Sequence, residues 1–287
     1  MERFQIFIQL TRLNKPIGIM LLFWPCAWGI SLGYFFDGQT TIYLKHLILF
    51  FFGSILMRSA GCIVNDIVDR NLDKKVTRTK NRPIASGKIS VNESLIYVIL
   101  LCLIALFILL QFNKLTIVFG LGSMFLAFAY PFMKRITYWP QLFLGLTFNW
   151  GIIMGWASIM NGISIEPIIL YISAIFWTLG YDTIYGLQDR QDDEIIGVKS
   201  TSIKFKNNVK IFVGACYCFC VLFILLMFFM MNIEKYLLPI SLLFIATLVY
   251  QIKLFKASSP STCLAAFKNN NLTGFFIFFF IFSFELL

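Results

Sequence analysis

Long apolar stretches, each able to cross a lipid bilayer as a helix, divide this sequence from end to end. A spanning helix needs roughly 20 mostly apolar residues, and about nine such stretches can be drawn here. Hydrophobic residues make up 59% of the 287 positions and charged residues 13%, far from the values of soluble domains. We therefore predict an all-α, polytopic membrane bundle of about nine transmembrane helices. The predicted spans are Pro16–Phe36, Leu44–Val64, Leu95–Phe112, Leu115–Phe132, Gln141–Met160, Pro167–Leu187, Val209–Met231, Tyr236–Leu254 and Leu272–Leu287.

Two aspartate clusters interrupt this apolar chain, and both contain the pattern Asp-Arg-x-x-Asp. Carboxylates are costly near a bilayer, so a repeated cluster indicates a functional site. In the first cluster, a second span that continues as a helix past Val64 would place Asn65, Asp69 and Asp73 on one face, with Asp66 beside them.

The second cluster follows the sixth predicted span. A continuous helix there would place Asp182, Asp189 and Asp193 on one face, with Tyr185 adjacent. Both clusters would then lie at helix C-termini, where the helix dipole already disfavours negative charge. The two clusters therefore favour bound cations, and we interpret residues 1–287 as one membrane domain of two similar halves, each carrying one cluster.

The ligand types in these clusters predict which cation binds. Carboxylate and amide oxygens without His or Cys suit a hard ion such as Mg²⁺, which commonly bridges carboxylates to a substrate phosphate. Neighbouring basic residues could hold the phosphate oxygens that the ion does not reach. The alternative is that the aspartates cap helices and pair with these cations at headgroup level. The basic residues concerned are Arg78, Arg82, Lys134 and Lys199.

Arg58 lies inside the second apolar span, about two turns before Asn65. It could extend toward the interface or pair with an aspartate. An intramembrane cation that faces the same cavity could also hold a carboxylate of a substrate.

The distribution of Lys and Arg predicts the orientation of the helices. With a cytoplasmic N-terminus, 20 Lys and Arg lie on that side and 3 on the other. The positive-inside rule then places both aspartate clusters in the cytoplasm and the C-terminus outside. The first span lacks a cleavage-site signature and is expected to remain as a helix. The net charge of +10 fits this topology and contact with anionic lipids, so we expect the lipid bilayer as a partner and no nucleic acid.

The remaining reactive residue types exclude some mechanisms. His46 is the single histidine, which argues against a histidine base or a Ser-His-Asp triad. The seven cysteines form no Cys-x-x-Cys pair and fall mostly in apolar spans, where they are expected to pack as small core residues.

The motifs resemble the UbiA superfamily of intramembrane prenyltransferases, and specifically its 4-hydroxybenzoate branch. The resemblance covers essentially the whole chain and is carried by both aspartate motifs and their flanks. The matching segments are Arg12-Leu13-Asn14-Lys15-Pro16-Ile17-Gly18, Met57-Arg58-Ser59-Ala60-Gly61-Cys62, Asn65-Asp66-x-x-Asp69-x-x-x-Asp73, Arg78-Thr79-Lys80-Asn81-Arg82-Pro83, Tyr130-Pro131-Phe132-Met133-Lys134-Arg135, Tyr181-Asp182-Thr183-Ile184-Tyr185-x-x-x-Asp189-x-x-x-Asp193, Lys199-Ser200-Thr201 and Phe267-Lys268-Asn269-Asn270.

This resemblance implies nine helices around a central cavity that opens sideways to lipid. It implies Mg²⁺-dependent transfer of a polyprenyl chain from its diphosphate to the ring of 4-hydroxybenzoate, a step of ubiquinone biosynthesis, in a bacterial inner membrane and with no obligate protein partner. By the family's pattern, the metal ligands would be Asn65, Asp66, Asp69, Asp73, Asp189 and Asp193, with Tyr185 also catalytic. The substrate-binding residues would be Arg12 and Arg58 for the aromatic carboxylate, Arg78, Arg82, Lys134 and Lys199 for diphosphate, and Asp182.

Two alternatives remain open from the sequence. One is another branch of the same superfamily, which prenylates a menaquinone, haem or chlorophyll precursor. The other is a secondary transporter, in which the two halves form inverted repeats and the aspartates couple cations. Two repeats that are four spans apart cross the membrane in the same direction, whereas inverted repeats cross it in opposite directions. This disfavours the transporter.

Overall fold

The computed structural model describes residues 2–38, 40–233 and 237–283. Every regular element in these ranges is an α-helix, as predicted. The elements are α1 (Glu2–Thr11), α2 (Ile17–Asp37), α3 (Thr40–Asp73), α4 (Val91–Leu109), α5 (Lys114–Ile136), α6 (Pro140–Met160), α7 (Ile165–Gly186), α8 (Arg190–Ile196), α9 (Thr201–Lys204), α10 (Val209–Met230), α11 (Leu237–Leu254) and α12 (Pro260–Ser283).

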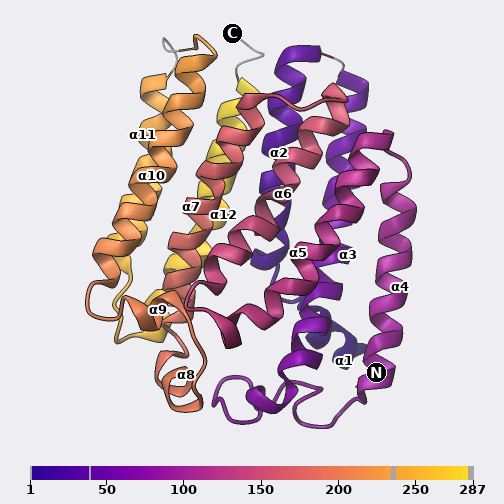
Figure 1. Ribbon diagram of the computed structural model, residues 1–287, viewed down its shortest axis with the longest axis vertical. Coiled ribbons are helices and arrows are strands. Elements are labelled where there is room, and N and C mark those ends of the chain that lie inside the picture. Colours follow the sequence, from indigo (N-terminus) through magenta and orange to yellow (C-terminus); the bar gives the residue numbers. More distant parts are fainter. Residues whose placement is uncertain (1, 39, 234–236, 284–287) are drawn as a thin grey trace.

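The long helices run side by side along the long axis of the molecule, and the short helices α1, α8 and α9 gather at one end (Figure 1). Seven of the described helices are long and apolar enough to cross a membrane, namely α2 to α7 and α10. Helices α11 and α12 lie in the same bundle and correspond to the last two predicted spans. The prediction of a polytopic helical bundle is confirmed.

The last predicted span differs from the structure at its start. Helix α12 begins at Pro260, not at Leu272, because its polar residues are bonded inside the bundle. Asn271 accepts a hydrogen bond from Trp24 Nε1 (3.0 Å) and Asn270 one from Trp177 Nε1 (2.8 Å). These asparagines thus tie α12 to α2 and α7. The predicted boundaries at Tyr236 and Leu287 lie outside the described residues.

Local sequence signals account for several helix ends. Ser90 caps α4 and forms a reciprocal capping box with Glu93, and Asn113 caps α5 by accepting from Thr116 N (2.9 Å). Gly38 ends α2 in a left-handed conformation (φ 67°), which glycine adopts without strain.

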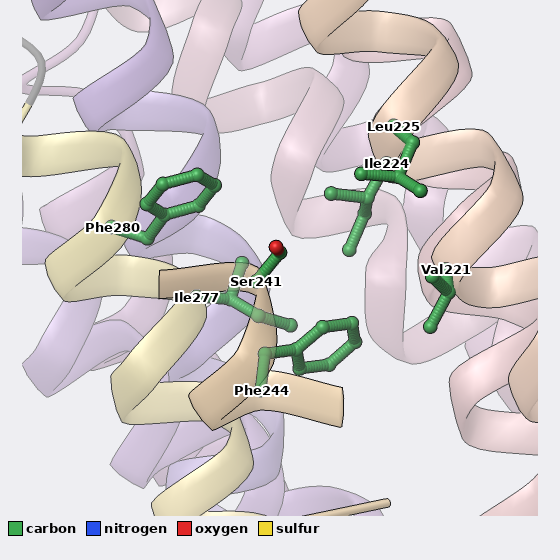
Figure 2. A pocket seen from close by; sticks show the side chains of 7 residues that line it. All are labelled: Val221, Ile224, Leu225, Ser241, Phe244, Ile277 and Phe280. Atoms are coloured by element: carbon green, nitrogen blue, oxygen red, sulfur yellow. The ribbon is translucent and has the colours of Figure 1, made fainter. Parts of the chain in front are cut away.

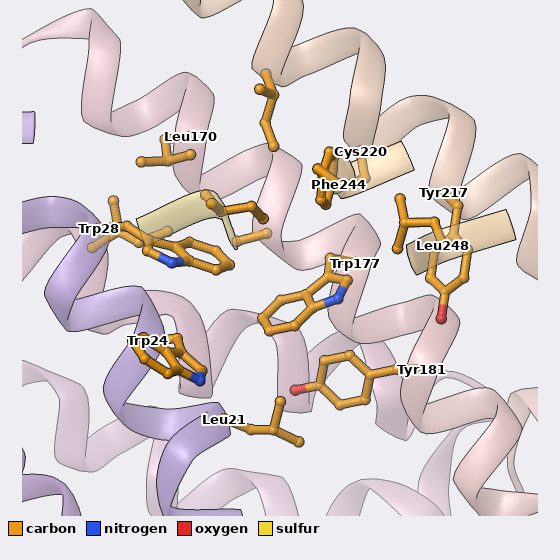
Figure 3. Close-up of a cluster of buried hydrophobic side chains, with 14 of the residues drawn as sticks. Leu21, Trp24, Trp28, Leu170, Trp177, Tyr181, Tyr217, Cys220, Phe244 and Leu248 are labelled. Carbon is orange, nitrogen blue, oxygen red and sulfur yellow. The ribbon is translucent and has the colours of Figure 1, made fainter. Parts of the chain in front are cut away.

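Tight packing between α2 and α6 forms the centre of the bundle. A Cβ added at Gly29 would lie 2.1 Å from the Ile152 carbonyl oxygen, and one at Gly155 would lie 2.5 Å from the Cys26 carbonyl oxygen. Glycine is therefore required where these two backbones meet, as is common between membrane helices. Beside this contact, Trp28, Trp177 and Tyr181 form an aromatic core that joins α2 to α7 (Figure 3).

Candidate active site

The first aspartate cluster lies on the last turns of α3, which continues as one helix to Asp73. Its carboxylates are almost fully buried, with Asp66 and Asp69 each 1% exposed and Asp73 6% exposed. The predicted shared face required the second span to continue as a helix past Val64, and α3 does so. Asn65, Asp69 and Asp73 therefore lie on one face.

Arginines from two connections neutralise this cluster. Arg12, between α1 and α2, donates to Asp66 Oδ1 (2.6 Å). Arg82, in the connection after α3, donates to Asp66 Oδ1 (3.0 Å) and to Asp73 Oδ2 (2.9 Å). Arg12 also has a positive φ of 55°, an uncommon backbone conformation for a side chain of this size. The chain therefore holds Arg12 against Asp66 at some conformational cost.

Asp69 pairs with two basic residues at the end of α5. Lys134 Nζ donates to Asp69 Oδ2, and Arg135 Nη2 lies 3.4 Å from Asp69 Oδ1. Arg135 also donates to the Val68 carbonyl oxygen (2.8 Å). The sequence interpretation included Lys134 but missed Arg135, although its position beside Lys134 in the same basic segment was a usable signal.

The second cluster has a different backbone from the one predicted. Helix α7 ends at Gly186, the chain turns, and Asp189 then occupies the N-cap position of α8. The expected continuous face from Asp182 to Asp193 is therefore wrong. The physical reason is electrostatic: Asp193 lies in the first turn of α8, where the helix dipole favours a carboxylate that the C-terminus of α7 would disfavour.

Arg78 joins the two clusters. Its Nε donates to Asp189 Oδ1 (2.7 Å) and its Nη1 to the Tyr185 hydroxyl (3.0 Å), while the guanidinium lies 5.3 Å from the centre of the Tyr185 ring. A second link is the backbone N–H of Thr77, which donates to Asp192 Oδ2 (2.9 Å). The connection after α3 thus holds the second cluster beside the first, as the sequence interpretation required.

Asp193 shows that cations suit the second cluster. Burial, followed by the charge of Asp189, raises the pKa of the Asp193 carboxyl to about 6. Burial and the neighbouring carboxylate thus oppose ionisation of Asp193, and a positive charge placed beside it would favour ionisation.

Arg58 and Asp182 are half-buried and lie on α3 and α7 before the ends of these helices, where the other ionisable residues of the two motifs gather. The Arg58 guanidinium lies 5.2 Å from the centre of the Phe148 ring and packs against Gly18, where an added Cβ would come 2.7 Å from Arg58 Nε. Arg58 interacts electrostatically with Asp182 on α7, and Tyr130 on α5 interacts with both. These side chains of three helices therefore face a common region.

Lys199 does not reach either cluster in this structure. Its ammonium donates to the Ile136 carbonyl oxygen (3.1 Å) and lies 5.7 Å from the centre of the Tyr138 ring. Its backbone N–H donates to the Lys134 carbonyl oxygen (2.9 Å), so it supports the segment that carries Lys134.

An apolar recess of about 10 Å³ lies elsewhere, between α10, α11 and α12 (Figure 2). Its lining includes Val221, Phe244 and Ile277 and no ionisable side chain. This volume holds about one water molecule, so the recess is a packing defect far too small for a substrate.

The donor atoms of the first cluster suit Mg²⁺. Within the described ranges, no three acidic, His or Cys side chains form a ready-made ion cage. Magnesium in phosphate sites typically takes one or two carboxylates and completes its shell with water and phosphate oxygens, so a complete cage is not required. Asp66, Asp69 and Asp73 offer only hard oxygen donors, and the ion pairs of Arg12, Arg82 and Lys134 bring cations beside them. The residues present fit Mg²⁺ that binds together with a diphosphate.

The described residues thus form a helical membrane bundle with a charged site of carboxylates and basic side chains at one end. Comparison with known families agrees, since the model of the UbiA prenyltransferase family matches residues 22–283. The chain belongs to the UbiA prenyltransferase family and is a multi-pass integral membrane protein.

Curated relatives refine this similarity. The chain is 40% identical over 278 residues to 4-hydroxybenzoate octaprenyltransferase of Psychromonas ingrahamii, covering 96% of this chain and 95% of that protein. It is 38% identical over 272 residues to the enzyme of the same name from Coxiella burnetii, covering 95% and 93%. The mitochondrial 4-hydroxybenzoate polyprenyltransferase of Arabidopsis thaliana is 46% identical over 211 residues, which cover 73% of this chain and 51%, about half, of that protein.

Solved structures share the fold. A UbiA homolog from Aeropyrum pernix without ligand superposes with a TM-score of 0.74 at 22% identity, covering 93% of this chain and 98% of that one. A UbiA homolog from Archaeoglobus fulgidus bound to GPP and Mg²⁺ superposes with a TM-score of 0.73 at 18% identity, covering 98% and 100%.

Proposed function

We propose that this enzyme transfers a polyprenyl group from polyprenyl diphosphate to the ring carbon ortho to the hydroxyl of 4-hydroxybenzoate, with Mg²⁺ and in ubiquinone biosynthesis. The main supporting observation is that Arg78 and Thr77 bring two carboxylate clusters together at one end of the bundle, while Arg58 lies half-buried against the Phe148 ring, earlier on α3. The names of the bacterial relatives and the GPP and Mg²⁺ bound to the Archaeoglobus homolog support the same chemistry.

The two clusters would bind the diphosphate. Bound Mg²⁺ would neutralise the diphosphate and so make it a better leaving group. Asn65, Asp66, Asp69 and Asp73 from α3 and Asp189 and Asp193 from the second cluster are the proposed ligands. Arg78, Arg82 and Lys134 now pair with these carboxylates and would bind phosphate oxygens when the ion takes their place. A diphosphate contact by Lys199 requires its side chain to turn away from the Ile136 carbonyl oxygen.

The interior would bind the aromatic acceptor. Arg58 lies eight residues before Asp66 on α3, about 12 Å along the helix axis, so it is placed to hold a carboxylate away from the diphosphate. Arg12 is already held by Asp66 near the cluster and is better placed for phosphate than for the acceptor. The apolar walls would shield the allylic cation from water until the ring attacks.

Product analysis tests this proposal. Membranes that contain the enzyme, incubated with 4-hydroxybenzoate, prenyl diphosphates of several lengths and Mg²⁺, should yield prenylated 4-hydroxybenzoate by mass spectrometry. Prenylation of a naphthoate or haem acceptor in place of 4-hydroxybenzoate would assign the chain to another branch. Cation-driven uptake into liposomes without any prenylated product would favour a transporter.

The Arg58 assignment predicts a separation of the two substrates. A charge-assisted pair at a dry site loses roughly 2–5 kcal/mol when one partner is removed, so Arg58→Ala should raise the KM for 4-hydroxybenzoate by tens-fold or more. The KM for prenyl diphosphate should change little. Gly18→Ala is a milder version, because the new Cβ would displace the Arg58 guanidinium. An increase confined to the diphosphate KM would refute this role of Arg58.

We also propose that the enzyme lies in a bacterial inner membrane with the N-terminus and both clusters cytoplasmic. The supporting observations are the basic-residue count and the position of α1, α8 and the end of α3 at one end of the bundle, opposite the last turn of α12 (Figure 1). Cysteines introduced at Lys80 and Lys206 should resist a membrane-impermeant label in intact cells. A cysteine at Lys114, at the other end of the bundle, should react, and the reverse pattern would invert the topology.

A further inference from the structure

Asp182 and Arg58 carry opposite charges, yet neither forms an ion pair or hydrogen bond with any residue that the structure describes. Asp182 is half-buried on α7 and interacts electrostatically with Arg58 on α3. Arg58 contacts the Phe148 ring instead of a carboxylate. Such charges are expensive inside a membrane bundle, and groups of this kind mark functional positions.

The other carboxylates of the two motifs are engaged elsewhere. Asp66, Asp69, Asp73 and Asp189 each accept from an arginine or lysine. Asp192 accepts from Thr77 N, and Asp193 lies on α8, outside the long helices. Asp182 is the motif carboxylate that lies within a long helix of the second half and faces the region where the acceptor ring is proposed to bind.

The position of Asp182 along α7 places it between the two substrates. Tyr185, one turn later on the same helix, accepts from Arg78, which marks the diphosphate side. Tyr130 interacts electrostatically with Asp182, with Arg58 and with Asp69 of the first cluster. A ring whose carboxylate is held by Arg58 would therefore present its other edge toward Asp182 and the diphosphate.

We propose that Asp182 is the general base that removes the ring proton, an inference that rests on the proposed prenylation of 4-hydroxybenzoate. The bond between the prenyl C1 and the diphosphate oxygen breaks, and its electron pair leaves with the diphosphate. A ring electron pair forms the new bond between C1 and the carbon ortho to the hydroxyl. That carbon then loses its proton to an Asp182 oxygen, the C–H electron pair restores the aromatic ring, and Asp182 later releases the proton to water.

The groups around Asp182 suit this role. The charged and titratable side chains that face it are Arg58 from α3, Tyr130 from α5 and Tyr181 from α7. Arg58 stabilises an ionised Asp182 before the acceptor binds, and the acceptor carboxylate then engages Arg58. The carboxylate of Asp182 is thereby left beside the ring with no cation committed to it, so its oxygens are free to accept the ring proton.

The test uses Asp182→Asn, which keeps the size of the side chain but removes its basicity, in purified full-length enzyme. General base removal typically costs about 10²–10⁴-fold in rate, so kcat should fall by this factor while both KM values stay within a few-fold. Removal of the ring proton should become the rate-limiting step in this variant. 4-Hydroxybenzoate deuterated ortho to the hydroxyl should then show a primary isotope effect that the unsubstituted enzyme lacks. Glu166→Gln, the same chemical change at the start of α7, is the matched control and should leave kcat unchanged.

A second measurement separates this step from ionisation of the donor. Exchange of the bridging oxygen of labelled prenyl diphosphate reports C–O cleavage without prenyl transfer; it should persist in Asp182→Asn and disappear in Asp69→Ala. Loss of exchange in Asp182→Asn would overturn the proposal, because Asp182 would then act on the diphosphate. A normal kcat in Asp182→Asn would also overturn it. Asp182→Glu keeps a base and should recover part of the rate, which guards against a folding defect. If the unsubstituted enzyme makes no prenylated 4-hydroxybenzoate, the proposed function itself fails.

Discussion

The two aspartate clusters share the letters Asp-Arg-x-x-Asp but differ in backbone and burial. The first lies on one unbroken helix, and its carboxylates are 1–6% exposed and paired with cations from two connections and from the end of α5. The second is divided between the end of α7, a turn and α8, and its one ion pair among the described residues is the half-exposed Arg78 with Asp189. A repeated motif has thus produced one rigid site and one site whose position depends on a short helix and a single arginine.

This difference suggests a division of labour. The first cluster is preorganised, since packing and several ion pairs set its geometry before any substrate binds. The second cluster can adjust, because α8 is short and connects to α9 through a loop. We expect the first cluster to carry more of the stability and the second to complete the site around the diphosphate.

The largest effects should come from removing one ligand in each cluster. Asp69→Ala and Asp189→Ala should each abolish turnover, because losing a ligand costs several kcal/mol of transition-state stabilisation. Only Asp69→Ala should also lower the thermal unfolding midpoint in detergent, since it removes the buried carboxylate that pairs with both Lys134 and Arg135. More than trace activity in either purified variant would contradict a two-cluster metal site.

Removing the metal should affect catalysis but not the fold. Chelation should stop turnover, and added Mg²⁺ should restore it, while the unfolding midpoint changes little. The reason is that arginines and a lysine already neutralise the buried carboxylates of the first cluster. A large loss of stability on chelation would show that the ion, and not these cations, holds the first cluster together.

A smaller contrast is expected between two arginines of the same connection. Arg82→Ala leaves Asp66 and Asp73 with one fewer partner in a buried position and should destabilise the protein by about 2 kcal/mol. Arg78→Ala should leave stability nearly unchanged and raise the KM for prenyl diphosphate about tenfold, equivalent to about 1.4 kcal/mol. Measuring both variants for unfolding and for KM would reveal whether this division exists, and equal stability losses would remove it.

The smallest effects concern two glycines with left-handed backbones, Gly197 (φ 76°) after α8 and Gly87 (φ 77°) in the connection after α3. An alanine at either position should cost about 1–2 kcal/mol of backbone strain. Gly197→Ala should also reduce turnover a few-fold, because the Gly197 N–H bonds to the Asp193 carbonyl oxygen and ends α8. Gly87→Ala is the matched control, because it adds the same backbone strain at a position outside the second cluster. An equal loss of turnover in Gly87→Ala would argue against an adjustable α8.

The sequence alone was sufficient for the class of fold and for the first cluster. Apolar stretches of spanning length predict membrane helices because the bilayer requires every backbone group to bond within the helix. The four-residue spacing from Asn65 to Asp73 predicts one face for the same local reason, and α3 has it. The resemblance of the motifs to the UbiA superfamily was likewise readable from the residues and agrees with the family match.

Only the tertiary structure decided which charges meet. Several features depend on how separate helices pack. Helix α7 ends at Gly186, and Arg78 bonds to Asp189. Arg135 lies beside Asp69, and Lys199 bonds to the Ile136 carbonyl oxygen. Helical periodicity is a local property, so it reaches only along one element. The Lys134–Asp69 and Arg78–Asp189 pairs join residues that are 65 and 111 positions apart in the sequence. They form only because packing brings the ends of α3, α5 and α7 together with α8 at one end of the bundle.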